Sequence, residues 1–247
     1  MAELAQHRWL FIRGLGREAR HWRELPSLWQ QHFPRSTIEC IDLPGNGTLW
    51  QHRSPTQIAS LIEWLHDRYS HLVPITLLGL SLGGMVAYHW MQKYPQDIRA
   101  IIMINSSLAP FNHRWQRLRP GALKNLLQAL KHSGYEREAM IFDLTCANQE
   151  QREQTLIQWH LWQQQCPVSR TNLIRQLLLA NSCKADSQPP KRPTLLVSGS
   201  QDRLVDPVSS DCLARQWLVP VLQHPQAGHD LPHDVPEWLI SQVKQWL

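Results

Sequence analysis

The sequence predicts an α/β protein with a mostly parallel sheet, helices on its flanks and an inserted helical cap. Short apolar runs alternate with segments of helical periodicity, as expected of βαβ units. Only the stretch from residue 108 to about 186 breaks this alternation. The chain has 247 residues, of which 43% are hydrophobic and 18% charged, so one α/β domain with an insertion fits its length.

Candidate strands are short runs rich in Ile, Leu and Val, a composition typical of parallel strands that are buried on both faces. In chain order they are Trp9–Ile12, Thr37–Ile41, Ile75–Leu80, Ala100–Asn105, Thr194–Ser198 and Val219–Gln223. Between and after these runs, apolar residues recur at helical spacing. This pattern covers residues 58–65, and it returns at Leu239, Val243 and Leu247 behind Pro236, which suits the first turn of a helix.

The segment 108–186 contains no convincing strand and is rich in Gln, Arg, Leu and Trp. Its clearest helical stretches are Arg119–Lys131, Glu150–Gln165 and Ser169–Ala180. The proline-rich segment Ser187–Pro193 then leads back to a strand, because prolines neither continue a helix nor donate to a ladder. We therefore expect a core of residues 1–107 and 187–247 and a cap of residues 108–186.

Composition excludes several classes of protein. The cysteines are five, scattered and without CxxC spacing, which argues against a disulfide framework or a zinc knuckle and suits a cytoplasmic protein. We expect no metal and no cofactor. Residues 1–9 lack the pattern of a secretory signal, and no apolar run is long enough for a membrane span. The net charge of +5 comes from dispersed residues without a nucleic-acid-binding motif, so we expect no nucleic-acid partner.

The strongest motif is Gly79-Leu80-Ser81-Leu82-Gly83, a G-x-S-x-G pattern at the end of one predicted strand and the start of a helix. A sharp turn there would crowd side chains two residues to either side of the serine, and glycine at both places relieves that crowding. The helix N-terminus also favours a developing anion. Ser81 is therefore the predicted nucleophile; the alternative is a tight turn whose serine only caps the helix.

A serine nucleophile needs a base, and the base needs an orienting acid. Asp202 and His229 follow the last two predicted strands in the required order, and the carboxyl ends of parallel strands share one edge of the sheet. Asp206 is a rival acid, but it precedes Pro207 and fits a helix cap better. His233 is a rival base, but it lies beyond Pro232, in the approach to the last helix.

The oxyanion hole is expected from two backbone N–H groups, those of Leu82 and Leu15. Leu15 lies in the loop after the first long strand, where Gly14 lets the backbone approach the serine. The Gly14-Leu-Gly16 pattern resembles a dinucleotide-binding fingerprint only weakly, because Ala19 takes the place of the third glycine.

These motifs resemble the α/β-hydrolase superfamily over essentially the whole chain. The matching pieces are Arg13-Gly-Leu-Gly16 with Trp22 downstream, Asp42-Leu-Pro-Gly45, Gly79–Gly84, Gly199-Ser-Gln-Asp202 and Ala227-Gly-His229. Within the superfamily, the chain is most similar to small bacterial carboxylesterases of the pimeloyl-acyl-carrier-protein methyl ester esterase type, a likeness that includes the run Ala100–Ser107. The resemblance implies the α/β-hydrolase fold and ester hydrolysis through a Ser81–His229–Asp202 triad.

Two positions depart from the family pattern. Arg13 stands where His is usual before Gly14; it would either hold a substrate carboxylate or form a structural salt bridge. Thr48 stands at the place of a usual serine after Asp42, so one hydrogen bond of that loop is expected to differ.

The predicted reaction is hydrolysis of small or acyl-chain esters or thioesters. A serine at this turn argues against dehalogenase and epoxide hydrolase chemistry, which needs an aspartate there. Two alternatives stay open: a lyase of the menaquinone-pathway type with the same triad, and a binding protein without catalysis. The cap's basic residues would suit an acidic acyl-carrier protein, and three tryptophans are candidates for the wall of an acyl pocket. The basic residues are Arg114, Arg117, Arg119, Lys124 and Lys131, and the tryptophans are Trp115, Trp159 and Trp162.

Overall fold

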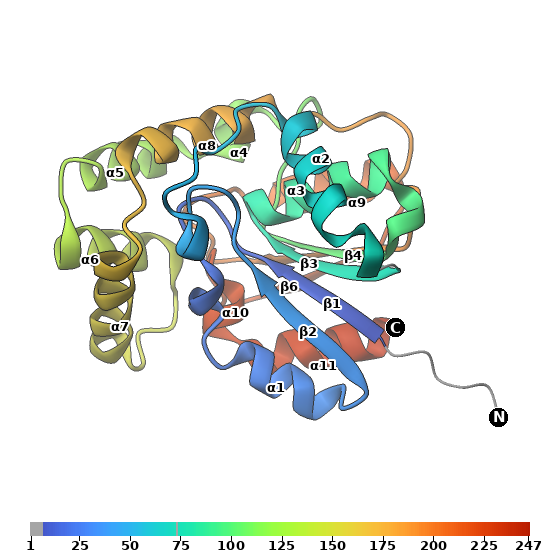
Figure 1. Ribbon diagram of the computed structural model, residues 1–247, viewed down its shortest axis with the longest axis horizontal. Coiled ribbons are helices and arrows are strands. Elements are labelled where there is room, and N and C mark those ends of the chain that lie inside the picture. The colour runs from blue at the N-terminus through green and yellow to red at the C-terminus, as the bar shows by residue number, and fades with distance from the viewer. Residues whose placement is uncertain (1–6, 73) are drawn as a thin grey trace.

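The computed structural model describes residues 7–72 and 74–247, which form a parallel six-stranded sheet with helices on both faces (Figure 1). The strand order is β2-β1-β3-β4-β5-β6, so the chain starts inside the sheet, adds β2 at one edge, and returns past β1 to build the other half. The strands are β1 (His7–Ile12), β2 (Ser36–Ile41), β3 (Ile75–Leu80), β4 (Ile98–Ile104), β5 (Thr194–Gly199) and β6 (Val221–His224). The predicted α/β fold class is confirmed.

Each predicted strand overlaps an observed one, and the differences lie at the ends. The sixth strand begins at Val221 rather than Val219, because Pro220 between them has no N–H to donate to the ladder. The fourth begins two residues earlier than predicted, at Ile98, because Arg99 interrupts the apolar run in the sequence but points to solvent in the structure.

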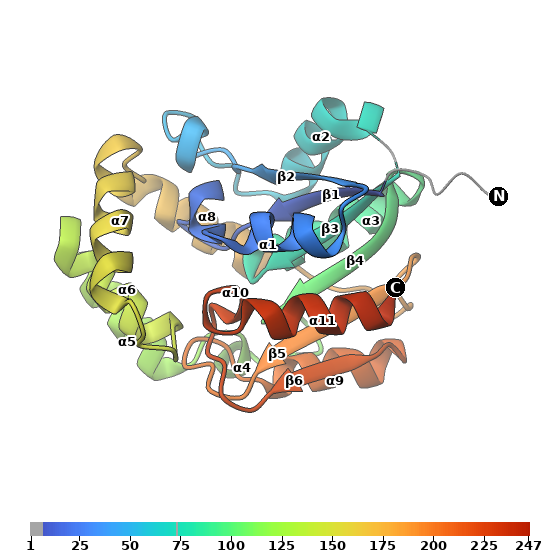
Figure 2. The same ribbon diagram turned by 90° about the horizontal axis from the view of Figure 1, so that it is seen from below.

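Successive side chains along the buried strands pack into two separate hydrophobic cores, one on each face of the sheet. In β1, Trp9 and Phe11 pack on one side of the sheet, whereas Leu10 and Ile12 pack on the other. Helices α1 (Leu25–His32) and α11 (Pro236–Trp246) cover the first side. Helices α2 (Ile58–Tyr69), α3 (Leu82–Lys93) and α9 (Val208–Trp217) cover the second (Figure 2). Burial on both faces explains why these strands lack the alternation of a half-exposed sheet.

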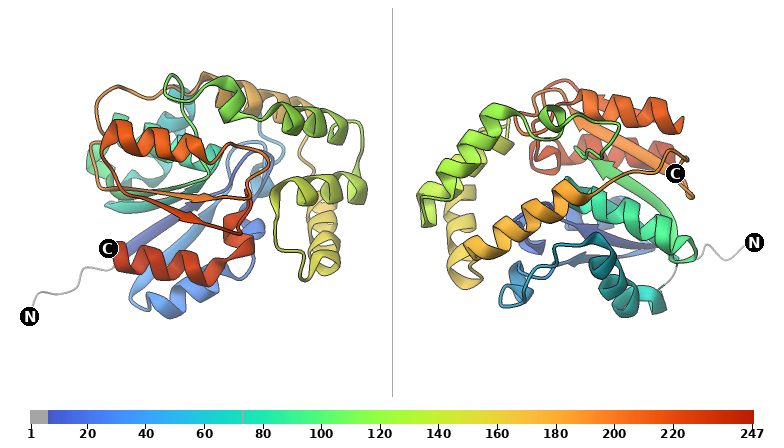
Figure 3. Two further views of the ribbon diagram at one scale, coloured as in Figure 1. Left: turned by 180° about the vertical axis from the view of Figure 1, so that it is seen from behind. Right: turned by 90° about the horizontal axis from the view of Figure 1, so that it is seen from above.

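Five helices lie between β4 and β5, a stretch that the structure describes without a gap. They are α4 (Arg114–Arg117), α5 (Pro120–Ala129), α6 (Gly134–Thr145), α7 (Arg152–Gln165) and α8 (Arg170–Ser182). They lie together on the side of the sheet toward which the carboxyl ends of the strands point (Figures 1 and 3). The segment enters and leaves at a single place, where Ala109 and Lys184 form a β-bridge and Ala185 donates its N–H to the Ala109 carbonyl. We call residues 108–186 the cap.

Four of the remaining elements are short 3₁₀ turns and one is a single helical turn before α11. They are η1 (Ala19–Trp22), η2 (Gly47–Leu49), η3 (Ser70–Leu72), η4 (Pro95–Asp97) and α10 (Leu231–Asp234). None of the helices in the described ranges is long and apolar enough to cross a membrane.

Candidate active site

Ser81 lies on the sharp turn between β3 and α3. Its backbone has φ +56° and ψ −115°, a strained combination for a residue with a side chain. The two motif glycines make this turn possible, since a Cβ on Gly79 would lie 2.4 Å from the Gly83 carbonyl carbon. A Cβ on Gly83 would lie 2.0 Å from the Ile12 carbonyl oxygen of the neighbouring strand. The turn therefore has room for glycine alone at both places.

The loop after β1 passes directly beside Ser81. A Cβ on Gly14 would come within 3.3 Å of the Ser81 Cβ, so glycine allows this approach. Leu82 is the first residue of α3, where no helical carbonyl is available to its N–H. Within residues 7–72 and 74–247, no partner is found for the N–H of Leu15 either. Among the described residues, neither predicted oxyanion donor thus has a backbone or side-chain acceptor, and both residues line the same cavity as the serine.

Asp202 and His229 meet at the carboxyl ends of β5 and β6. The His229 Nδ1 lies 2.7 Å from Asp202 Oδ2, and the two side chains are only 6% and 0% exposed. A carboxylate can only accept, so Nδ1–H donates and Nε2 is left as an acceptor. Asp202 Oδ1 accepts the N–H groups of Leu204 and Val205, which fixes the orientation of the carboxylate.

Asn105 holds this region together and was not among the predicted residues. Its Nδ2 donates to the carbonyls of Gly228 and His229, and its Oδ1 accepts the N–H of Gly199. One side chain therefore ties the loop that carries His229 to the strand before Asp202. A polar residue at the end of an apolar strand was the only signal in the sequence, and it does not distinguish this role from an ordinary turn.

Ser81 and His229 line one cavity of about 230 Å³ between the sheet and the cap. Leu15 and Leu82 line it as well, and Asp202 lies behind His229. Most of the remaining wall is apolar and comes from the cap. Its apolar members there are Leu118, Leu126, Ala129, Leu130, Ile141, Val168, Leu173, Leu177 and Ala180. The polar cap residues in the lining are Arg114, Arg117, Arg137, Glu138, Thr145 and Asn181. The predicted nucleophile and base thus share the floor of a largely apolar space, with the predicted acid behind the base.

A model of the alpha/beta hydrolase family matches residues 9–242. The chain belongs to the α/β-hydrolase family. A pimeloyl-[acyl-carrier protein] methyl ester esterase of Xylella fastidiosa is 36% identical over 86 residues, which are 35% of this chain and 32% of that protein. The enzyme of the same name from Aeromonas hydrophila is 23% identical over 229 residues, 83% of this chain and 88% of that one.

Among solved structures, a hydrolase from Pseudomonas aeruginosa PA01 superposes with a TM-score of 0.76 at 18% identity. The superposition covers 100% of this chain and 91% of the Pseudomonas aeruginosa chain, and at this identity it shows a shared fold alone. The match to the first relative, in Xylella fastidiosa, spans only about a third of that protein's length. The predicted resemblance to α/β-hydrolases is confirmed.

Arg13, the main departure from the α/β-hydrolase pattern, forms a buried salt bridge. Its Nη1 and Nη2 donate to the two oxygens of Asp230 at 3.0 and 2.6 Å, and its guanidinium stacks on Trp22. Burial alone would raise the pKa of Asp230, but the Arg13 guanidinium outweighs it and lowers that pKa. The structure therefore favours the salt-bridge interpretation of Arg13, because Asp230 accepts from both Nη atoms. Arg13 also lines the cavity, so its contact with a substrate stays a prediction.

The three tryptophans expected to wall the acyl pocket do not contribute to the cavity lining among the described residues. Trp159 is fully buried against Phe142 and beneath the guanidinium of Arg17. Trp162 contacts the ring of His21, and Trp115 is half exposed. The structure does not support this prediction: leucines, an isoleucine, a valine and alanines form the apolar part of the wall, while the tryptophans of α7 pack the cap against the core.

The rival residues occupy other places. Asp206 Oδ1 accepts the Val208 N–H at the start of α9, as expected of a residue that caps a helix. Its Oδ2 also lies 3.5 Å from Arg119 Nη2. Thr48 occupies the position where a serine is usual, and its hydroxyl donates to Asp42 Oδ2.

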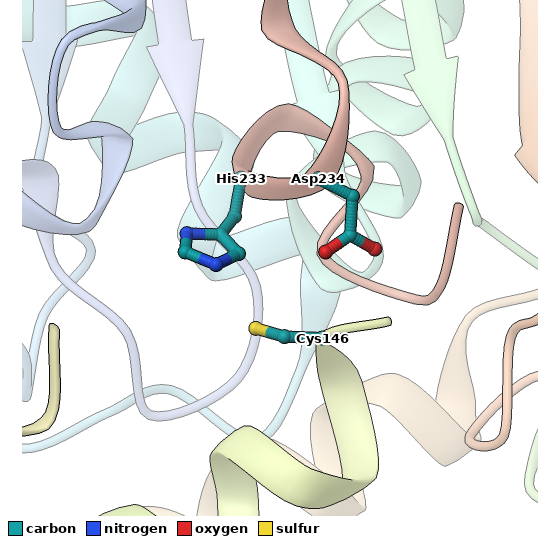
Figure 4. Close-up of side chains that lie close together, drawn as sticks. All are labelled: Cys146, His233 and Asp234. Atoms are coloured by element: carbon teal, nitrogen blue, oxygen red, sulfur yellow. The ribbon is translucent and has the colours of Figure 1, made fainter. Parts of the chain in front are cut away.

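Cys146, His233 and Asp234 bring three potential metal ligands within 4.8 Å of one another (Figure 4). Asp234 already has structural partners, since it accepts the N–H groups of Ala147, Asn148 and Gly228. His233 Nε2, in contrast, is buried without a hydrogen-bond partner among the described residues. Arg23 Nη1 lies 3.1 Å from His233 Nδ1. Because a guanidinium can only donate, His233 Nδ1 is the acceptor of this hydrogen bond. Burial also raises the pKa of the Cys146 thiol well above its usual value. A metal bound through Asp234 would compete with the contacts of its carboxylate, which tie the cap to the His229 loop.

Proposed function

We propose that the chain is a serine esterase that cleaves carboxylic esters or thioesters through an acyl-enzyme on Ser81. The observation that carries the proposal is the buried Asp202–His229 hydrogen bond beside a serine at a strained turn, with both His229 and Ser81 facing an apolar cavity. The names of the curated relatives, esterases of an acyl methyl ester, support the same reaction class.

In the proposed mechanism, His229 Nε2 takes the hydroxyl proton of Ser81 while Ser81 Oγ attacks the ester carbonyl carbon. The N–H groups of Leu15 and Leu82 donate to the resulting oxyanion. The bond to the leaving oxygen or sulfur then breaks, and His229 returns its proton to the leaving group. Water next loses a proton to His229 and attacks the acyl carbon of the acyl-enzyme. The bond to Ser81 Oγ then breaks, His229 returns its proton to Oγ, and the carboxylic acid is released. Asp202 holds the required tautomer of His229 throughout.

Substitution Ser81→Ala tests the proposal directly. We expect turnover of a p-nitrophenyl acyl ester to fall by a factor on the order of 10⁶, because the nucleophile is lost. A fluorophosphonate probe should label the natural chain at Ser81 and leave the variant unlabelled. Full esterase activity in the folded variant, or no labelling of the natural chain, would refute the proposal and favour a non-catalytic binding protein.

A further inference from the structure

The outer surface of the cap carries apolar side chains at regular positions on two helices. On α5, Leu123 and Leu127 are 37% and 52% exposed. On α8, Ile174 and Leu178 are 51% and 55% exposed. Single exposed leucines are common, but pairs four residues apart form a continuous stripe along a helix. Trp115 on α4, 52% exposed, adds an aromatic side chain, and we call these five residues the apolar rim.

The apolar rim borders the cavity that contains Ser81. On α5, Leu126 lines the cavity, as does Leu130 at the C-cap directly after the helix; each lies three residues after a member of the exposed pair. On α8, Leu173 and Leu177 line it, each one residue before a member of the exposed pair. Residues three or four apart are neighbours on a helix, so the apolar surface continues from the cavity wall to the exterior.

Helices α5 and α8 run in opposite directions along the cavity that both of them line (Figures 1 and 3). On both helices, the exposed residues are rotated about the helix axis in the same sense from the cavity-lining ones, by roughly 60–100°. In two antiparallel helices that face a common space, such a rotation brings the exposed residues to the same side of the pair. The exposed pairs of α5 and α8 therefore lie on one side of the cavity. Since they are exposed, that side is the outer one.

The cap is also the basic part of the molecule. Residues 108–186 contain ten Lys and Arg against six Asp and Glu, which accounts for four of the five net positive charges of the chain. Arg114, Lys124 and Arg170 are exposed on the same helices as the apolar rim, and Lys131 is exposed in the turn after α5. Arg114 stacks on Trp115 and also lines the cavity. Apolar and cationic side chains thus occur together at the cavity.

We propose that the apolar rim docks on an anionic lipid surface and admits a lipid ester from it into the cavity. The proposal rests on the proposed esterase function and names its substrate class as an ester of an amphiphile presented at an interface. The rim side chains enter the headgroup region while the cations bind anionic headgroups. An acyl chain then passes from lipid to apolar wall without crossing water. An acidic carrier protein would satisfy the cations but would leave most of the rim uncovered.

Vesicle flotation tests the proposal with phosphatidylcholine vesicles, with or without phosphatidylglycerol. The test variant is Leu127→Glu/Leu178→Glu. The matched control is Ile157→Glu/Leu161→Glu on α7, whose residues are similarly exposed but which contributes no described residue to the cavity lining. We expect the natural chain and the control to bind phosphatidylglycerol vesicles, less at high salt, and the test variant to bind at least about tenfold more weakly.

Activity separates this proposal from the esterase proposal. For the test variant, the rate on an ester embedded in vesicles, divided by its rate on a dissolved short-chain ester, should fall about tenfold or more relative to the control. Three results would overturn the docking proposal: no vesicle binding by the natural chain, equal loss in the control, or a rim covered by an acyl-carrier protein or a second copy in solution. If vesicles bind but no ester is cleaved, the esterase proposal fails while docking stands.

Discussion

Ser81 is held in its strained conformation by hydrogen bonds on both sides. Its N–H donates to the Ile104 carbonyl at 2.8 Å, and its carbonyl accepts the Ser106 hydroxyl at 2.9 Å. Both partners come from β4 and the residues after it. The glycines of the motif predict the turn, because they are needed locally, but the hydrogen bonds that hold it depend on a neighbouring strand and leave no local pattern.

Substitution of the two candidate acids should separate their roles. Asp202→Asn is expected to lower kcat by about 10⁴-fold, since an amide can donate to His229 and favours the wrong tautomer. Asp206→Asn should change kcat little, because that residue accepts an N–H at the start of α9 and pairs with Arg119 rather than with His229. Steady-state kinetics on one dissolved ester compares them. Equal losses in the two variants would contradict the assignment of Asp202.

The buried Arg13–Asp230 pair should reveal itself in stability. Arg13→Met leaves a buried carboxylate without its counter-ion, and we expect a loss of about 3–5 kcal/mol in the free energy of unfolding. Adding Asp230→Leu should recover much of that loss, because the pair is then replaced by apolar groups. Urea unfolding of the natural, single and double variants measures this. A single variant as stable as the natural chain would show that the pair contributes nothing.

At the scale of an element, α3 depends on glycine where it passes β1. Gly83→Ala should destabilise the protein by about 1–3 kcal/mol or more, because the added Cβ meets the backbone of Ile12 and Arg13. Gly121→Ala on α5 is the matched control: nothing lies within 4 Å of its Cβ, and we expect a gain of about 0.4–1 kcal/mol. Thermal unfolding of both variants checks the contrast, and it would be refuted if Gly83→Ala were neutral.

The helices of the cap differ in how well the sequence predicts them. Helix α8 was predicted nearly in full, and its start at Ser169 is marked by a side chain that accepts the Asn172 N–H. Helix α6 was missed because it buries Arg137 and Glu138, where an amphipathic pattern would have apolar residues. Glu138 is buried because it pairs with Arg17 of the core. Contacts between distant segments, such as this one and that of Asp230 with Arg13, cannot be found from local periodicity.

At the scale of the whole molecule, buried histidines should make stability depend on pH. Burial lowers the pKa of His89 to about 4, and burial with the nearby Arg17 lowers that of His21 well below its usual value. In the unfolded chain a histidine titrates near 6.5. Between about pH 6.5 and 4 the unfolded state therefore binds more protons than the folded one, so stability should fall as the pH falls through this window.

The variant His89→Gln should flatten part of this decline, because it removes one of the groups that take up a proton on unfolding. The exposed His52→Gln is the control and should leave the curve unchanged. The unfolding midpoint measured from pH 7 to 4 decides. Identical curves for His89→Gln and the natural chain would contradict the burial of a neutral ring at this position.

The bridge between Ala109 and Lys184 has a consequence for how such a chain can diversify. Because the two ends of the cap lie side by side, above the neighbouring strands β4 and β5, an insertion of almost any length closes without disturbing the sheet. Ser81, Asp202 and His229 all lie outside that insertion. In the proposed mechanism, the residues that transform the substrate are therefore encoded outside the segment that supplies most of the cavity wall.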